Sequence, residues 1–404
     1  MATAEAPRPS EFDVYEMVNP VDLPRVSRSD LFSRGVDGIV VEGDGTERLF
    51  ERKGPAFVDD PDQVGLFSSG MGATKYLYPP AFTAVITDAI LVGYRTILTP
   101  KRQFFTDEGY AEPSVFQHQL NRISKSESFA NEATGLRPTK SERVFEFDAG
   151  NRVSKHVEGN TLVLCSDEPF SYGSFLFRVV PKAKAVRDLG LMSTPCIAYA
   201  GQKPFMDLLN FCGISEETIQ LHDINALTRI DRAIVPCMRD PHAYLDPESC
   251  EVYAELREKV GNPPSGKKVY VSRRSLNNEG WSTRIMTNEG ELIAKLESMG
   301  FDIVEPELIC VRDQIKAFSS ASIIVGPSGS GLFNTMFCHP GTKVIDIQSE
   351  PQWIYSYTGM YSSLQLNYGI FVGKADPADT KPVHRRWTVN VDALIARIKR
   401  FLTE

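Results

Sequence analysis

The feature that most constrains the fold of this chain is a regular alternation of short apolar runs with longer amphipathic stretches. In the first series, apolar runs at 160–166, 194–200 and 218–223 are separated by stretches of helical pattern at 171–190 and 202–214. Short apolar runs bounded by turn residues are typical of buried strands, and stretches of this length suit the helices that cross between parallel strands. This series therefore predicts a βαβαβ unit.

A second series of the same kind occupies the C-terminal part of the chain. Thr287 is well placed as the N-cap of its first helix, and Gly300 as its stop. Glu289 and Glu291 supply negative charge to the first turn of that helix. A final amphipathic helix is predicted at 390–403. The other predicted elements are strands at 268–274, 301–307, 322–326 and 342–348, and helices at 287–300, 312–321 and 331–337. Together they predict a second doubly wound half.

The length of the chain, 404 residues, is too great for one compact core and favours two domains. Residues 1–80 mix Pro, Gly and charged residues with short apolar runs, which predicts an N-terminal extension wrapped on the body. Residues 81–240 are predicted to form a Rossmann-like domain that begins with β-rich hairpins, and residues 241–404 a second one. The segment 237–267 is predicted to hold a linker and a connecting helix. The predicted fold class is thus α/β, with two Rossmann-like domains facing each other across a cleft.

The segment IIVGPSGSGLFN (323–334) places a glycine-rich loop between a predicted strand and a predicted helix. That order points free backbone N–H groups and the positive end of a helix dipole at one place, where an anion is stabilised. The spacing matches neither the dinucleotide motif nor a Walker loop, in which a Lys would stand at Leu332. A tight strand-to-helix turn without a ligand is therefore the alternative.

A pair of arginines, Arg273 and Arg274, follows another predicted strand, directly after Ser272. The carboxyl ends of parallel strands meet at one edge of a sheet, so these residues are expected beside the glycine-rich loop. A guanidinium group offers a diphosphate paired charged donors and stays protonated near neutral pH. A solvated basic turn is the alternative, and the shared sheet edge favours the phosphate interpretation.

Several segments resemble glycosyltransferase family 61, whose members include bacterial capsular-polysaccharide enzymes and plant and animal glycan-building enzymes. In the N-terminal half, SYGSFLFRVVPK (171–182) is similar to the N-Y-x-H-W/F-L-x-D-x-L-P-R segment of that family. The resemblance runs from about residue 80 to about residue 375. In the C-terminal half it rests on VYVSRR (269–274), Arg284, Asn288, Glu289, GFDIVEPE (300–307), the segment 313–337 and TKVIDI (342–347).

Three positions depart from the family pattern. Ser174 stands where the family usually has His, Arg178 where it usually has Asp, and Ser328 where its loop usually has His. The resemblance implies a GT-B-like fold and inverting, metal-independent transfer of a sugar from a nucleotide-sugar donor to a glycan acceptor. It also implies a role in capsular or surface polysaccharide biosynthesis. The departures bear on how the acceptor is activated.

Transfer from a nucleotide sugar requires cations and N–H donors at the leaving diphosphate and a base at the acceptor hydroxyl. The predicted phosphate-binding residues are Ser272, Arg273, Arg274, Arg284, Ser328, Gly329, Ser330 and Gly331, and the predicted nucleoside-binding residues are Glu307, Asn334 and Asp346. The predicted acceptor pocket includes Tyr172 and Phe175, and the predicted catalytic residues are Ser174, His222 and Asp223. A structural role is the alternative for Asn334 and for each carboxylate, and Phe175 is equally a core residue.

The identity of the base stays open at this point. Asp167 and Glu168 precede a predicted helix, and His222 and Asp223 follow a predicted strand, so all four are expected at the edge of the cleft. A surface or capping role is the alternative for each of these four residues. Ser174 alone has no basic group to accept the proton.

The predicted partners are a nucleotide-sugar donor and a glycan or lipid-linked glycan acceptor, and a homodimer is left open. The formal net charge of −8 argues against a nucleic-acid partner, because such proteins carry a basic surplus. No apolar stretch is long enough to span a bilayer and the first residues show no leader pattern, so the expected location is cytoplasmic or peripheral to the inner face of the cell membrane. No metal or other cofactor is expected, since the histidines and cysteines lack ligand spacing.

Two other functions compete with this one. The serines at two family histidine positions are compatible with a catalytically silent relative that binds nucleotide or glycan and acts as an assembly or regulatory subunit. Asp60 and Asp62 form a D-x-D pair, which metal-dependent glycosyltransferases use to hold a divalent ion. That pair lies in an acidic loop without a βαβ unit around it, which favours a solvated turn.

Overall fold

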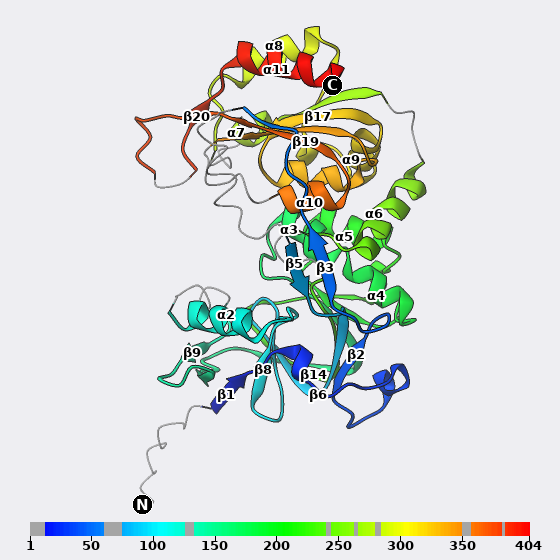
Figure 1. Ribbon diagram of the computed structural model, residues 1–404. Helices are drawn as coiled ribbons and strands as arrows, with labels where there is room; N and C mark the ends of the chain where they lie inside the picture. The colour runs from blue at the N-terminus through cyan, green and yellow to red at the C-terminus, as the bar shows by residue number, and fades with distance from the viewer. Residues whose placement is uncertain are drawn as a thin grey trace, which may run out of the picture.

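A computed structural model gives a mixed α/β fold with two large sheets (Figure 1). The structure describes residues 13–59, 75–125, 133–239, 244–261, 266–278, 284–349, 357–381 and 384–404. A parallel sheet with its helices lies at one end of the molecule, and a mixed sheet lies at the other (Figure 1). Within the described ranges no helix has the length and apolar character needed to cross a membrane.

The mixed sheet contains the predicted βαβαβ unit. Strands β11 (Ser154–Leu164), β12 (Cys196–Ala198) and β13 (Ile219–Leu221) are parallel, and β14 (Leu227–Pro236) lies parallel to β11 on its other side. The connecting helices are α3 (Tyr172–Ser174), a π-helical turn (Phe175–Val179), α4 (Lys182–Asp188) and α5 (Lys203–Phe211). The strand order β13-β12-β11-β14 is that of a Rossmann-like half.

The other strands of this sheet form the hairpins that the sequence predicts before the βαβαβ unit. Strand β6 pairs antiparallel with both β14 and β7, and β7 pairs antiparallel with β8. The sheet continues through β1 to β10 and β9, and β2 pairs with β6. The bounds are β1 (Asp13–Met17), β2 (Gly38–Val41), β6 (Phe82–Val92), β7 (Thr96–Leu98), β8 (Gln103–Phe105), β9 (Leu136–Pro138) and β10 (Val144–Phe147), with helix α2 (Pro113–Lys125) between β8 and β9.

The second sheet has six strands in the order β16-β15-β17-β18-β19-β4, and every pairing in it is parallel. Strands β15 to β18 and helices α8, α9 and α11 are those that the sequence predicts. The sequence did not predict β19, α10 or the sixth strand, β4. The bounds are β15 (Lys267–Val271), α7 (Arg274–Asn278), α8 (Glu289–Ser298), β16 (Phe301–Val304), α9 (Val311–Ser319), β17 (Ala321–Pro327), β18 (Lys343–Gln348), α10 (Thr358–Ser363), β19 (Asn367–Val372) and α11 (Val391–Thr403).

The helix predicted after the glycine-rich loop is present as a 3-10 helix, η8 (Ser330–Phe337). One local prediction in this half was wrong, because the N-cap of α8 is Asn288, one residue after Thr287. Thr287 turns its hydroxyl to the carbonyl of Trp387 at 3.3 Å, and the Asn288 amide donates to the carbonyl of Val389 at 2.8 Å. Packing against the segment before α11 therefore overrides the capping preference of Thr287.

The halves are joined by helix α6 (Pro247–Val260), which lies in the predicted linker and begins at the N-cap Asp246. Its Tyr253 donates a hydrogen bond to the carbonyl of Leu176 at 2.8 Å and stacks edge-on against Phe337, with ring centroids 6.0 Å apart. Leu176 belongs to the mixed-sheet half and Phe337 to η8. One apolar cluster therefore runs through both halves around α6.

The segment predicted to be an N-terminal extension contributes strands to both sheets. Strand β2 pairs with β6 of the mixed sheet, and β4 (Phe57–Val58) pairs with β19 of the parallel sheet. Between them, the hairpin of β3 (Arg48–Glu51) and β5 (Lys75–Tyr78) lies between the two sheets (Figure 1). The extension thus bridges the two halves of the molecule.

Replacing Gly369 by Ala is expected to loosen β4 from the parallel sheet. A Cβ at Gly369 would lie 2.1 Å from the Phe57 ring, which is closer than packed atoms approach. We expect the free energy of unfolding to fall by about 1–3 kcal/mol, as for other overpacked sites. Urea denaturation measures this, with Gly290→Ala in helix α8 as a control because open space surrounds Gly290. Equal stability of Gly369→Ala and the wild type would contradict the close contact of Gly369 with Phe57.

Candidate functional site

The turn after β15 is held by Glu289, the first residue of α8. Its Oε1 accepts hydrogen bonds from the Ser272 hydroxyl at 3.0 Å and from the Arg273 backbone N–H at 3.2 Å. The hydroxyl of Tyr270 donates to the same oxygen at 3.1 Å. Ser272 and Glu289 are both buried, so this carboxylate fixes the direction in which the chain leaves the sheet. The sequence suggested only a helix-start role for Glu289.

The guanidinium of Arg273 lies against the glycine-rich loop. A Cβ at Gly329 would be 2.2 Å from Nη1 of Arg273 and 3.4 Å from Nη2 of Arg284, so both cations converge on this glycine. Arg273 forms no ion pair or side-chain hydrogen bond with any described residue, and its Nε is buried. Burial and the neighbouring charge of Arg284 lower the pKa of Arg273. Two like charges held together in this way favour an anion between them.

Arg274 points away from that place. Its exposed side chain forms an ion pair with Glu305 at 2.8 Å, which raises the pKa of the guanidinium. Glu307 lies close by and accepts a hydrogen bond from the hydroxyl of Ser275. The structure therefore places Arg274 and Glu307 on an outer rim, from which the carboxylate of Glu307 acts on Arg273 through its charge.

The glycine-rich loop approaches β15 closely. A Cβ at Gly326 would be 2.8 Å from Cβ of Val271, and one at Gly331 would be 3.0 Å from Cγ1 of the same residue. Helix η8 starts at Ser330, and its first turn bond runs from the N–H of Leu332 to the carbonyl of Gly329 at 2.9 Å. The N–H groups of Ser330 and Gly331 come before that bond, beside Arg273. This is the arrangement of donors that a phosphate oxygen requires.

Behind the loop, Asp346 and Gln348 of β18 are buried polar residues. Burial raises the pKa of the Asp346 carboxyl from 3.8 to about 7, although the Tyr361 hydroxyl and the charge of Arg284 act to lower it. Tyr361 donates to Oδ2 of Asp346 at 3.1 Å, while no described residue gives Oδ1 or the amide of Gln348 a hydrogen bond of ordinary geometry. The Ser328 side chain lies in the same buried region. Buried polar atoms of this kind are rare away from functional sites.

The predicted acceptor residues lie where the two halves touch. The hydroxyl of Tyr172 is 2.8 Å from Oδ1 of Asn334 and 3.0 Å from Oε1 of Gln314. The Asn334 amide is fully buried and donates to the carbonyl of Gly331 at 3.2 Å. Phe175 is 1% exposed and stacks on Phe205 with centroids 4.4 Å apart. Asn334 and Tyr172 thus tie α3 to η8, and Phe175 belongs to the core. The structural role of Asn334 and the core position of Phe175 are the alternatives that the sequence left open.

Within the described residues, Ser174 forms no hydrogen bond with either of the other predicted catalytic residues, His222 and Asp223. The hydroxyl of Ser174 donates to the carboxylate of Glu168. His222 is buried with Nε2 at 2.6 Å from the carbonyl of Gly93, and burial lowers the pKa of its imidazole. Asp223 is paired with Lys155 at 2.8 Å, which lowers the pKa of the carboxyl. The carboxylate that accepts from Ser174 is therefore that of Glu168, one of the four candidate bases, and not that of Asp223.

A comparison with protein-family models identifies the family of one segment of the chain. The model described as Glycosyltransferase 61 matches residues 172–345. This segment belongs to glycosyltransferase family 61. It runs from α3 through the arginine turn and the glycine-rich loop into β18, and the family implies a glycosyltransferase. No curated protein matches the chain.

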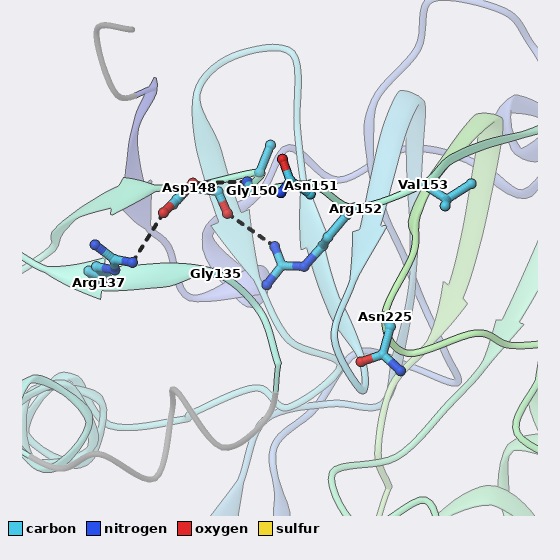
Figure 2. A pocket seen from close by; sticks show the side chains of 9 residues that line it. Gly135, Arg137, Asp148, Gly150, Asn151, Arg152, Val153 and Asn225 are labelled. Carbon is cyan, nitrogen blue, oxygen red and sulfur yellow. Dashed lines mark hydrogen bonds and ion pairs between the residues drawn. The ribbon is translucent and has the colours of Figure 1, made fainter. Parts of the chain in front are cut away.

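All eight predicted phosphate-binding residues lie within the family-61 segment, and Asp346, which was predicted to bind the nucleoside, directly follows it. A hollow of about 480 Å³ lies mainly outside the segment, beside the N-terminal end of β11 (Figure 2). Arg137 on its wall is paired with Asp148 at 3.1 Å, and Arg152 donates to the carbonyls of Thr134 and Asp148 at 3.2 and 3.1 Å. Both arginines on this wall therefore have partners beside the hollow. The guanidinium of Arg273, in contrast, forms no ion pair with any described residue.

The described part of the chain holds no group of three or more His, Cys, Asp or Glu side chains arranged to bind a metal ion. Asp60 and Asp62, the D-x-D pair, lie outside the described residues. The residues gathered around Gly329 are cations and N–H groups, which are donors to an anion and not ligands of a metal.

Proposed function

We propose that the protein is an inverting, metal-independent glycosyltransferase of GT-B type. It transfers a sugar from a nucleotide-sugar donor to a glycan acceptor, in capsular or surface polysaccharide biosynthesis. The observation that carries the proposal is the convergence of Arg273 and Arg284 on Gly329, at the carboxyl edge of a six-stranded parallel sheet. In open parallel sheets this edge is where ligands bind.

In this proposal the diphosphate of the donor lies between Arg273 and the first N–H groups of η8. As the bond from the anomeric carbon to the phosphate breaks, negative charge grows on the leaving diphosphate. Arg273 and Arg284 stabilise that charge, and the amides of Ser330 and Gly331 bind its oxygens. Ser272 and Glu289 act indirectly, because they hold the backbone of Arg273 in place. No metal ion is then required to neutralise the leaving group.

The remaining predicted residues take supporting positions in the proposal. Asp346 and Ser328 lie behind the loop and shape the nucleoside side of the site, and Glu307 lies on its rim. Tyr172 and Asn334 join the acceptor half to η8 and so set the spacing between the two substrates. Arg274 adds positive charge to the rim and is already paired with Glu305.

Replacing Arg273 by Ala is expected to abolish turnover, and Arg274→Ala to weaken it far less. The loss of one such donor costs about 2–4 kcal/mol of transition-state stabilisation. The measurement is release of nucleoside diphosphate from nucleotide sugars in the presence of glycan acceptors, with and without excess EDTA. Turnover that needs a divalent ion, or equal turnover of Arg273→Ala and the wild type, would contradict the proposal.

The second candidate function is a catalytically silent relative that binds nucleotide or glycan as an assembly or regulatory subunit. It is favoured by Ser174 and Ser328, which stand where the family usually has His. The same assay separates the two functions. Nucleotide binding without transfer to any glycan acceptor favours the silent relative, and transfer excludes it.

A further inference from the structure

We infer that Glu168 is the general base that activates the acceptor hydroxyl and that Ser174 positions it. This inference rests on the proposed function, since it names the base of the same transfer reaction. It answers the question that the serine at position 174 raises, namely which group accepts the proton where the family usually has His.

Glu168 lies on the loop that leaves the carboxyl end of β11 and leads into α3. Helix α3 packs against η8, because a Cβ at Gly173 would lie 2.6 Å from the Phe333 ring and Tyr172 is bonded to Asn334. Helix η8 begins beside Arg273. The loop of Glu168 therefore lies on the mixed-sheet side of the contact between α3 and η8. In the proposed reaction the acceptor approaches the donor from this side.

The other candidate bases have strong partners of their own. Asp167 forms ion pairs with Arg178 and, at 3.8 Å, with Arg95, which holds it as a structural carboxylate. His222 is buried with its Nε2 on the carbonyl of Gly93. Asp223 is paired with Lys155 at 2.8 Å. A carboxylate engaged with a cation is a weaker base than one engaged only with a hydroxyl.

Glu168 meets the requirements of a base in this position. It is exposed, and its one partner in the described chain is the hydroxyl of Ser174, which donates to Oε2. Ser174 is 6% exposed and its backbone N–H is bonded to the Ser171 hydroxyl at 3.3 Å, so it is a fixed support. The Ser174 hydroxyl orients the carboxylate and leaves Oε1 accessible to an acceptor.

An aromatic surface adjoins this carboxylate. Phe170, two residues after Glu168, is 52% exposed and stands edge-on against Tyr199 and Tyr94, with ring centroids 4.9 and 6.0 Å apart. The three side chains come from different segments of the mixed-sheet half. Phe170 is exposed and the two tyrosines are half-buried, and an aromatic surface of this kind, two residues from a carboxylate in the sequence, suits the C–H face of a sugar ring. This supports a glycan as the acceptor.

The proposed step balances without a further reactant. The acceptor oxygen bonds to the anomeric carbon as the bond from that carbon to the phosphate oxygen breaks. The proton of the acceptor hydroxyl passes to Oε1 of Glu168, and the electron pair of the broken bond leaves with the nucleoside diphosphate. Attack from the side opposite the leaving group inverts the anomeric centre.

The test replaces Glu168 by Gln, which keeps the size of the side chain and its bond to Ser174 but removes the basic oxygen. We expect kcat for transfer to fall by about 100- to 10,000-fold. The affinity for nucleoside diphosphate, measured by calorimetry on the same sample, should be unchanged, which also shows that the variant is folded. Glu158→Gln, an exposed glutamate of β11, is the matched control and should keep wild-type kcat.

Ser174 is tested as a positioning residue. Ser174→Ala should lower kcat with little change in KM for the donor, and Ser174→Thr, which keeps the hydroxyl, should restore most of it. Wild-type kcat in Glu168→Gln, or equal loss in Ser174→Ala and Ser174→Thr, would overturn the inference while leaving the nucleotide site intact. A wild-type protein that binds no nucleotide would instead overturn the proposed function, and this inference with it.

Discussion

Replacing Arg239 by Ala is expected to lower the free energy of unfolding by about 3–5 kcal/mol. Arg239 is 1% exposed and forms ion pairs with Glu42 and Glu248, and with Asp246 at 3.0 Å. Asp246 is the N-cap of α6 and is equally buried, so removing the guanidinium leaves a buried carboxylate with Arg48 as its remaining cation. Urea denaturation followed by circular dichroism measures the loss.

The matched control for this variant is Arg187→Ala. Arg187 also forms an ion pair, with Glu255, but both side chains are more than one-third exposed. An exposed pair contributes about 0–1 kcal/mol, so this variant should unfold almost like the wild type. Equal losses in the two variants would show that the Arg239 network does not hold the extension, the linker helix and the mixed sheet together.

The second large effect is expected from Asp346→Asn, as a change in how stability depends on pH. Burial raises the pKa of Asp346 to about 7 in the folded protein, above its value of 3.8 in the unfolded chain. The folded state therefore binds this proton more tightly, and the contribution of Asp346 to stability is lost as pH rises from about 4 to about 7. Across that range the loss amounts to about 4 kcal/mol. The side chain of Asn resembles the protonated carboxyl group and does not ionise. The variant therefore does not lose this stability as the pH rises.

The measurement for Asp346→Asn is urea denaturation of the variant and the wild type between pH 5 and pH 8. The stability difference should grow in favour of the variant up to about pH 7 and stay constant above it. Asp302→Asn serves as the control, because Asp302 is an exposed residue of β16. Parallel pH profiles for Asp346→Asn and the wild type would contradict the burial of an unpaired carboxylate behind the loop.

Much of the fold was predictable because its signals are local. The alternation of short apolar runs with helical stretches identified β11 to β13 and β15 to β18, and the glycine-rich loop falls between β17 and η8 as expected. Strand β4 was not predictable in the same way, since it consists of Phe57 and Val58 and pairs with a strand more than 300 residues later. Its position depends on the close contact of Phe57 with Gly369, which no local pattern contains.

The candidate site was predictable to a similar degree. The shared carboxyl edge of parallel strands brought Arg273 together with Gly329, as the sequence analysis expected. The same rule could not separate Arg274 from Arg273, because the Arg274 side chain is directed by its ion pair with Glu305 and the Arg273 backbone is held by Glu289. Whether Glu168, next to Asp167 in the sequence, is the base depends on contacts with Ser174 and Arg178, which only the folded chain shows.

The central claim is that a diphosphate binds between Arg273 and the loop at Gly329. The most direct test is a calorimetric titration of the wild type and Arg273→Ala with UDP, GDP, CMP and TDP, with and without EDTA. We expect saturable binding of one of the diphosphates UDP, GDP and TDP that withstands the chelator and disappears in Arg273→Ala, with the monophosphate CMP as the comparison. No binding by the wild type, or unchanged binding by Arg273→Ala, would mean that the glycines at 326–331 only turn the chain.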